Sequence, residues 1–180
     1  MNVPTLETAR LILRLPVKED FPAHFSLWGD PRTVRHFGGI TYDEADTWLR
    51  FLRNFGQWHL MGYGFWGVVE KDSRRYVGSL GYVHAKRSLD WEFRDLPEMG
   101  WAIHPDRHGR GYATEAVAAA QAWGDTHIEA PRTWCMINES NAISRKVAER
   151  AGYSFVQMAQ FKDMPVVILD RPRGGRQAVS

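Results

Sequence analysis

Two glycines and two arginines stand close together in the sequence HPDRHGRGYATEA, which runs from His104 to Ala116. A strand-like segment, Pro97–His104, leads into this motif, and an alanine-rich helical segment, Ala113–His127, follows it. The first N–H groups of a helix have no partner within the helix, and the helix dipole adds positive charge there. Glycine lets the backbone come close to a ligand. We therefore expect the loop amides to hold a phosphate or pyrophosphate, with Arg107 and Arg110 adding charge at the rim.

Two well-known phosphate motifs do not fit this loop. A Walker loop ends in Gly-Lys-Ser/Thr, whereas this loop ends in Gly111-Tyr112-Ala113. A dinucleotide fingerprint has a third glycine where Thr114 stands, and it follows the first strand of a parallel unit rather than the fourth predicted strand. A tight turn without a ligand is the alternative. Glu115 lies in the first helical turn, so its carboxylate has to point away from any bound phosphate.

The composition of the 180-residue chain fits one soluble globular domain, with 44% hydrophobic and 24% charged residues. A net charge of +2 is too small to indicate a nucleic-acid partner. The single cysteine, Cys135, excludes an internal disulfide and fits a reducing compartment. No signal segment and no apolar run of about 20 residues is present, so we expect a cytoplasmic protein without a membrane segment.

Two other chemistries lack their sequence signatures. The seven histidines are scattered, and His104 and His108 have no third ligand at a recognisable spacing, so no metal site is expected. The serine hydrolase pattern Gly-x-Ser-x-Gly is also missing, because Gly78-Ser79-Leu80-Gly81 has a different spacing.

Hydrophobic periodicity predicts a series of strands and helices. Apolar and basic residues alternate over Ala9–Leu15, which indicates a half-buried strand. Apolar residues recur every three or four positions from Ala45 to Phe55, which indicates a helix whose exit Gly56 and Gly62 bracket. Residues 85–96 are mixed, and we expect an irregular insertion there. The other expected helices are Lys18–Trp28, Ala113–His127 and Ser140–Ala151, and the other expected strands are Tyr63–Glu70, Tyr76–His84, Pro97–His104, Pro131–Ile137, Ser154–Ala159 and Met164–Asp170.

This order of elements predicts an α/β (α+β) fold. We expect a mixed, mostly antiparallel sheet of six to seven strands, with a central βαβ unit and about four helices. Residues 1–170 would form a single domain. The segment 171–180 is basic and rich in proline and glycine, which favours a flexible tail.

The glycine loop resembles the acyl-coenzyme A site of the GNAT acetyltransferases, whose signature is Gln/Arg-x-x-Gly-x-Gly/Ala between a strand and a helix. His108, Gly111 and Ala113 occupy the three specified positions, and His108 departs from the usual Gln or Arg. The strings GRGYATEA, LETARLILRLPVKED and NESNAISRKVAERAGYSFV are similar to the subgroup related to ribosomal-protein N-terminal acetyltransferases of the RimJ/RimL type. These segments stand in the family's order, so the resemblance spans residues 5 to about 170.

The resemblance implies acetyl-CoA as a co-substrate. In the family the fourth and fifth strands splay apart, and the pantetheine arm of acetyl-CoA pairs with strand backbone in the gap. That arm would lie along Trp101, Ala102 and Ile103. An N–H of the stretch 99–101 would hydrogen-bond the acetyl oxygen as it gains negative charge. The adenosine diphosphate end would lie on His108, Gly109, Arg110, Gly111, Tyr112, Ala113 and Thr114.

The reaction implied by the resemblance is attack of a primary amine on the thioester, after the ammonium has lost a proton. Glu98, at the start of the fourth strand, is the expected base, acting directly or through water. A surface glutamate without a role is the alternative, and His104 is a weaker candidate. Ser144 would approach the sulfur, and Asn141 would contact the pantetheine arm, although Ser140 or Asn141 also caps the helix. The further implied site residues are Asn138, beside cofactor or amine, and Lys146, towards the adenosine end.

The acceptor amine is left open by these motifs. A protein N-terminus, an amino acid, a polyamine and an aminoglycoside antibiotic all fit. Aromatic helix residues and the 85–96 insertion could frame the acceptor cleft or belong to the core, and an exposed aromatic at Trp91 or Phe93 could mark a homodimer contact. The second hypothesis is a regulatory module that binds acyl-CoA and transfers nothing, supported by the departure at His108. The aromatic residues concerned are Phe21, Phe25, Trp28, Phe37, Trp48 and Phe51.

Overall fold

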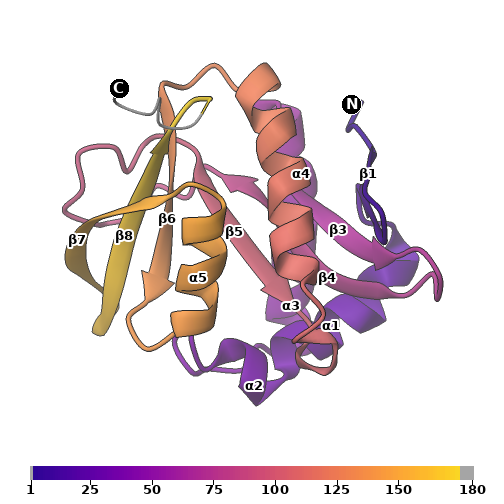
Figure 1. The fold of residues 1–180 in the computed structure, drawn as a ribbon. Helices are drawn as coiled ribbons and strands as arrows, with labels where there is room; N and C mark the ends of the chain where they lie inside the picture. The colour runs from indigo at the N-terminus through magenta and orange to yellow at the C-terminus, as the bar shows by residue number, and fades with distance from the viewer. Residues whose placement is uncertain (1, 175–180) are drawn as a thin grey trace.

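The chain forms an α+β fold around one open sheet (Figure 1). The computed structural model describes residues 2–174. The strands in this range are β1 (Leu6–Glu7), β2 (Leu11–Arg14), β3 (Phe65–Glu70), β4 (Tyr76–Val83), β5 (Glu98–Ile103), β6 (Arg132–Asn138), β7 (Ser154–Phe161) and β8 (Met164–Pro172). Their order across the sheet is β1-β2-β3-β4-β5-β6-β8-β7. Neighbouring strands are antiparallel except β5 and β6, which are parallel.

The predicted mixed, mostly antiparallel sheet is confirmed. The residues described form eight strands, one more than the predicted six to seven. The additional strand, β1, has two residues and pairs with β2 through Leu6↔Leu13 and Glu7↔Ile12. Two residues are too few to show the alternation by which a strand is recognised in a sequence.

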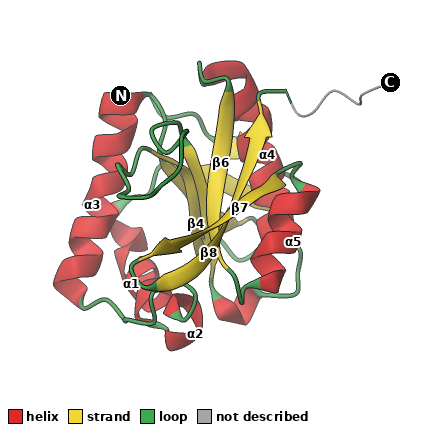
Figure 2. Cartoon of the chain, turned by 90° about the vertical axis from the view of Figure 1, so that its left-hand side faces the viewer, coloured by secondary structure: helices red, strands yellow, loops and turns green. Residues whose placement is uncertain are grey.

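Helices cover both faces of the sheet. Figure 2 shows α3 on one side of the strands and α4 and α5 on the other, and α1 and α2 lie on the α3 side. No helix in residues 2–174 is long and apolar enough to cross a membrane. The helices are α1 (Phe21–Gly29), α2 (Pro31–Val34), α3 (Glu44–Met61), α4 (Tyr112–His127) and α5 (Ala142–Arg150), with 3-10 turns at Lys18–Asp20 and Pro105–Arg107.

Helix α3 is longer than predicted. Asp43 caps its start by accepting the N–H of Asp46 (2.8 Å), and Gly62, with φ of 71°, ends it. Gly56 lies inside the helix, so its reading as part of the helix exit was wrong. Trp58 explains the extension, because this buried side chain packs on Trp66 with ring centroids 4.8 Å apart. That contact outweighs the low helix propensity of one glycine.

The short helix α2 was not predicted. Pro31 occupies its first turn, and Asp30 caps it by accepting the N–H of Arg32 (2.8 Å). One turn of helix is shorter than the hydrophobic period needed to recognise it. Its presence raises the count to five helices, where about four were expected.

The irregular insertion is confirmed: residues 85–96 contain neither helix nor strand. Leu89 and Trp91 are buried in it against Trp134 and Ile168. Trp91 is only 7% exposed, so it is not the exposed aromatic that was expected to mark a dimer contact. Phe93 is half-buried, and the Arg132 guanidinium carbon lies 4.3 Å from its ring centroid. The insertion therefore covers the β6–β8 part of the sheet.

The predicted tail begins later than residue 171. Arg171 and Pro172 belong to β8, and Arg171 forms two hydrogen bonds of 2.7 Å with Asp125 of α4. The N–H of Gly174 also donates to Asp125 (3.1 Å). Asp125 therefore fixes this segment to α4, and residues 175–180 of the predicted tail lie outside the described residues.

Candidate active site

Strands β5 and β6 separate soon after they begin. They share one register pair, Glu98↔Trp134, whereas β4 and β5 share six. The carbonyl of Pro97 faces β6, because it accepts the N–H of Trp134 (3.2 Å). Main-chain groups of alternate residues in a strand point to the same edge, so the N–H and C=O of Trp101 face the gap beyond that single pair. The splay expected between the fourth and fifth predicted strands, which are β5 and β6, is confirmed.

The loop between β5 and α4 presents a row of main-chain amides. Gly109 and Gly111 have φ of 75° and 77°, a region that glycine enters without strain. From Gly109 to Thr114 the six N–H groups have no acceptor in the described part of the chain, and the next amide, that of Glu115, donates to Gly111 (3.1 Å). These amides stand at the positive end of the 16-residue helix α4. The loop has the donors that a diphosphate needs.

Glu115 turns towards the N-terminal segment. Its carboxylate accepts the hydroxyl of Thr8 (2.6 Å) and the main-chain N–H of Arg10 (2.9 Å), and it forms an ion pair with the Arg10 guanidinium (2.6 Å). Burial raises the pKa of Glu115, but these hydrogen bonds outweigh burial and keep the pKa below its ordinary value. The negative charge in the first turn of α4 is thus paired with Arg10, which also donates to the carbonyl of Arg110 (2.8 Å).

Glu70 lies beneath the same loop. Its carboxylate accepts the hydroxyls of Ser73 and Tyr112, and the side chains of Arg107 and Arg110 come within 3.9 and 3.8 Å. The hydrogen bonds from Ser73 and then Tyr112 lower the pKa of Glu70. The charge expected from both arginines at the rim is therefore partly neutralised. Since its hydroxyl is engaged, Tyr112 can serve a ligand through its main-chain amide.

The side chain of His108 is turned back onto β5. Its Nε2 lies 2.8 Å from the carbonyl of Ile103. The side chains of Ala102 and Ile103 are buried in two different hydrophobic clusters. By the alternation along β5, the main-chain groups of Ile103 face the gap, whereas those of Ala102 face β4. The side chains of all three residues hold the loop and the strand in place.

A cavity of about 640 Å³ opens at the gap between β5 and β6. His104 and Lys146 do not line it: His104 accepts the N–H of Asp106 (3.3 Å) in the loop, and Lys146 is exposed on α5. Around this cavity the structure brings together five of the predicted site residues, some of them more than 40 positions apart in the sequence. The predicted site residues that line the cavity are Glu98, Trp101, Asn138, Asn141 and Ser144.

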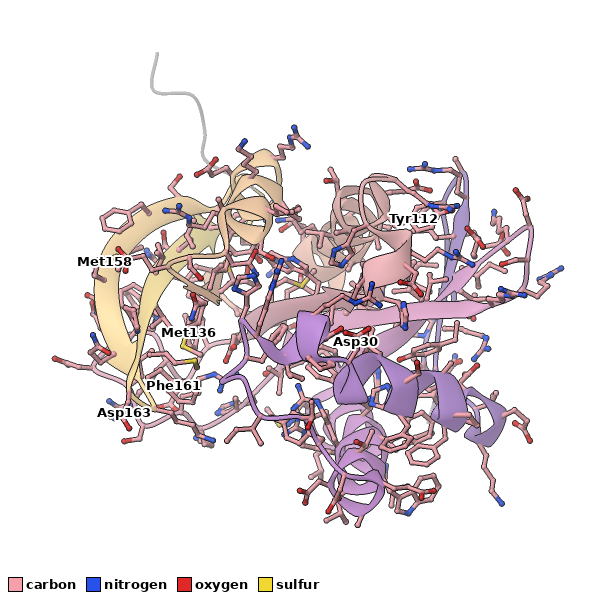
Figure 3. All side chains as sticks on the ribbon, turned by 90° about the horizontal axis from the view of Figure 1, so that it is seen from below. Asp30, Tyr112, Met136, Met158, Phe161 and Asp163 are labelled. Atoms are coloured by element: carbon pink, nitrogen blue, oxygen red, sulfur yellow. The ribbon has the colours of Figure 1, made fainter. Side chains whose placement is uncertain are left out.

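One wall of the cavity is apolar. Met136 and Phe161 line it and pack against one hydrophobic cluster. Figure 3, seen from below, shows both side chains in the β6–β8 part of the molecule, with Tyr112 at the start of α4, well apart from them. This wall lowers the access of water to the β6 side of the gap.

Glu98 is the buried carboxylate of the cavity. It is 5% exposed, so the alternative of a surface glutamate is wrong. Arg87, in the 85–96 insertion, donates to both carboxylate oxygens, at 2.5 and 2.8 Å. The bidentate bond fixes the orientation of the carboxylate at the start of the gap.

Asn141 and Ser144 lie together at the start of α5. The Asn141 side-chain oxygen accepts the N–H of Ser144 (3.1 Å), so Asn141 is the cap of this helix. The Ser144 hydroxyl has no hydrogen-bond partner among residues 2–174 and lines the cavity. The Asn138 side-chain oxygen accepts the N–H and hydroxyl of Ser140, at 3.0 and 2.7 Å. Ser144 therefore has a hydroxyl available to a bound molecule.

Sequence reasoning missed the arginines of the cavity. Arg50 and Arg53 of α3 line it, beside Arg87. A spacing of three residues places Arg50 and Arg53 on one helix face, but no local signal shows which face meets a cavity. Of the six aromatic residues considered for the acceptor cleft, Trp28 and Phe37 line the cavity, whereas the other four, Phe21, Phe25, Trp48 and Phe51, pack on one another.

No three His, Cys, Asp or Glu side chains in residues 2–174 are placed to hold a metal ion. A split sheet, an amide cradle fit for a diphosphate and an adjoining cavity with a buried carboxylate define the class of acyl-CoA-dependent acyltransferases. The comparisons with known proteins agree with this class.

The family model for the acetyltransferase (GNAT) domain matches residues 10–154, and the chain belongs to this family. It is 24% identical to the uncharacterized N-acetyltransferase YoaA of Bacillus subtilis, over 83% of this chain and 82% of that protein. An acetyltransferase structure from Agrobacterium tumefaciens is 29% identical, covers 94% of this chain and 95% of its own, and has a TM-score of 0.80.

The RimL ribosomal L7/L12 alpha-N-protein acetyltransferase, solved in complex with coenzyme A, has a TM-score of 0.77. The match covers 96% of this chain and 100% of that chain. At 13% identity the likeness shows the shared fold alone. The expected membership of the GNAT family, with RimL among the structural neighbours, is confirmed.

Proposed function

We propose that this N-acetyltransferase uses acetyl-CoA and acetylates a primary amine by direct attack on the thioester. The observation that supports this most strongly is the continuity of the two halves of the site. The amides of residues 109–114 stand at one end of the gap between β5 and β6, and the buried carboxylate of Glu98 lines the cavity at the gap. A molecule with a diphosphate and a long arm fits this arrangement.

In the proposed complex the loop amides bind the diphosphate, and Arg10 and Arg110 lie beside them. Trp101 offers an N–H and a C=O to the pantetheine arm, in place of the pairing that β6 does not provide. The residues of the proposed cofactor site are Trp101, Ala102, Ile103, His108, Gly109, Arg110, Gly111, Tyr112, Ala113, Thr114, Asn138, Asn141 and Lys146.

Glu98 is the proposed base. Its carboxylate takes a proton from the acceptor ammonium, directly or through one water, and leaves a nitrogen lone pair. That nitrogen forms a bond to the acetyl carbon as the carbon–sulfur bond breaks and sulfur leaves as a thiolate. The second proton of the nitrogen then passes to the thiolate, directly or through water, and gives the coenzyme A thiol. The Ser144 hydroxyl donates a hydrogen bond to the departing sulfur. An N–H of the stretch 99–101 stabilises the negative charge on the acetyl oxygen during attack.

The test measures release of the coenzyme A thiol in the presence of acetyl-CoA and a panel of peptides, amino acids, polyamines and aminoglycosides. We expect thiol release to require an amine, and mass spectrometry to find one acetyl group on that amine. Tight binding of coenzyme A with no release over the whole panel would instead identify an acyl-CoA-binding module without transfer.

A further inference from the structure

The lining of the cavity carries an excess of positive charge. Arg87 and Glu98 neutralise each other through their two hydrogen bonds. Burial lowers the pKa of His24 to about 4 and lowers that of His36, so neither imidazole adds charge at neutral pH. A single carboxylate, that of Asp46, is left to oppose three remaining cations of the described lining, Arg50, Arg53 and Lys162.

Arg50 lies against two aromatic rings that are perpendicular to each other, and it has no counter-ion. Its guanidinium carbon lies 3.7 Å from the ring centroid of Trp28 and 5.2 Å from that of Tyr42. It forms no ion pair with any carboxylate of residues 2–174, and neither does Arg53. Stacking uses the faces of a guanidinium and leaves its in-plane N–H groups available to an acceptor.

The positive charge of Arg53 disfavours that of Arg50. Burial, followed by this nearby charge, lowers the pKa of Arg50 to about 10. Both groups are still protonated at neutral pH. An anion between them would remove the repulsion and replace some of the lost hydration.

A buried donor in the same wall also lacks an acceptor. Trp28 is 3% exposed, and its indole Nε1 has no hydrogen-bond partner within the described chain. Trp28 lines the cavity beside Arg50. Buried donors without partners are uncommon in folded proteins, and this one lies beside a guanidinium that has no counter-ion. A ligand with acceptor atoms would serve both groups.

The coenzyme diphosphate is not this partner. The amide cradle stands at the start of α4, whereas Arg50 and Arg53 stand on α3, across the sheet from α4 (Figure 2). The arginines instead line the same cavity as the proposed base, Glu98. Their location points to the acceptor rather than to the cofactor.

We propose that the acceptor is a primary amine that also carries a carboxylate, bound by Arg50 and Arg53 with the amine directed to Glu98. This assignment rests on the proposed transfer to an amine. Polyamines and aminoglycosides would add positive charge to a cavity that already has an excess, so they are disfavoured. The carboxylate can be the main-chain group of a free amino acid or an acidic side chain at a peptide N-terminus.

The experiment compares matched acceptors with saturating acetyl-CoA. The first arm compares free amino acids with their amides and with their decarboxylated amines. The second arm compares peptide amides with and without Asp or Glu in the first two positions. The third arm contains spermidine and kanamycin. We expect kcat/KM to be about 100-fold higher for amines with a carboxylate than for their uncharged partners. Preference in the first or the second arm identifies the source of the carboxylate.

Arginine variants test the binding group. Arg50→Met and Arg53→Met remove the charge and keep an apolar stem of similar length; Arg75→Met removes an exposed arginine of the β3–β4 turn as the matched control. We expect both cavity variants to raise KM of the preferred acceptor about 10- to 100-fold, with KM for acetyl-CoA unchanged. Arg53 is exposed on α3, so the Arg53→Met variant still tests the proposal if the Arg50→Met variant does not fold. Calorimetry of the N-acetylated product binding to the wild type and to both variants gives a readout besides activity.

Two results would overturn the assignment while leaving the transferase intact: equal rates for uncharged or polycationic amines, or a carboxylate preference that survives both substitutions. Silence across all three arms, with coenzyme A still bound, would instead remove the proposed transfer itself and this inference with it.

Discussion

At the scale of single residues, Glu98 has two roles in the cavity, one proposed for catalysis and one structural. It lines the cavity as the proposed base, and it is the partner of Arg87 in a buried ion pair. Its residue type and position at the start of β5 could be read from the sequence. The partner could not, because Arg87 lies in an irregular segment whose path depends on packing against β6 and β8. Two substitutions separate the catalytic role from the structural one.

We expect Glu98→Gln to reduce kcat by about 100-fold, because an amide cannot take the proton of the acceptor ammonium. The affinity for acetyl-CoA, measured by calorimetry, is expected to stay unchanged. Arg87→Met is the matched control: it breaks the same ion pair but leaves the carboxylate. Equal losses of kcat in the two variants would show that the pair matters only for structure and would remove Glu98 as the base.

At the scale of elements, the sequence predicted best what local patterns determine. The strand β5, its glycine loop and helix α4 were recognised because alternation, two glycines and helical periodicity occur within 30 residues. The position of the loop amides at the start of a helix follows from this order of strand, glycine loop and helix alone. What the sequence did not show was contact between distant elements: Arg10 pairs with Glu115, and α3 brings two arginines to the cavity. Such contacts depend on the sheet order, which no local pattern contains.

The glycine loop gives the second prediction. Gly111→Asp places a carboxylate among amides that are proposed to bind a diphosphate, and we expect calorimetry to show at least about a 100-fold loss of coenzyme A affinity. Gly62→Asp is the matched control, because Gly62 has a similar φ of 71° but ends α3 away from the loop. Both variants share the backbone strain of a side chain at positive φ. If the two lose the same affinity, strain rather than charge explains the effect, and the loop is not the diphosphate site.

At the scale of the whole molecule, several elements meet at one buried imidazole. His24 of α1 is 1% exposed, its Nδ1 lies 2.8 Å from the hydroxyl of Tyr76 on β4, and its ring centroid lies 5.2 Å from that of Phe51 on α3. Helical spacing could place His24 on α1, but only the assembled layers show that it is enclosed. Burial, with a smaller effect from Arg50, lowers the pKa of His24 from 6.5 to about 4.

This shift makes the stability of the whole chain depend on pH. In the unfolded chain His24 binds a proton below about pH 6.5, whereas in the folded chain it stays neutral down to about pH 4. The unfolded state therefore binds more protons in this window, and the free energy of unfolding falls as the pH is lowered through it. Between pH 7.5 and 5 the loss from His24 is about 2 kcal/mol, since one pKa unit corresponds to about 1.4 kcal/mol.

Urea unfolding of the wild type and of His24→Gln at pH 7.5 and 5 measures this contribution. The variant is less stable at both values, because a buried side chain has been replaced, but we expect it to lose about 2 kcal/mol less than the wild type between them. The remaining histidines and the carboxylates titrate in both proteins, so their contributions cancel in the difference. An identical pH dependence in the two proteins would mean that His24 takes up its proton as readily in the folded state as in the unfolded state, so that it is protonated in the folded chain at pH 5. Its ring would then add a charge beside Arg50 and strengthen the demand of that cavity for an anion.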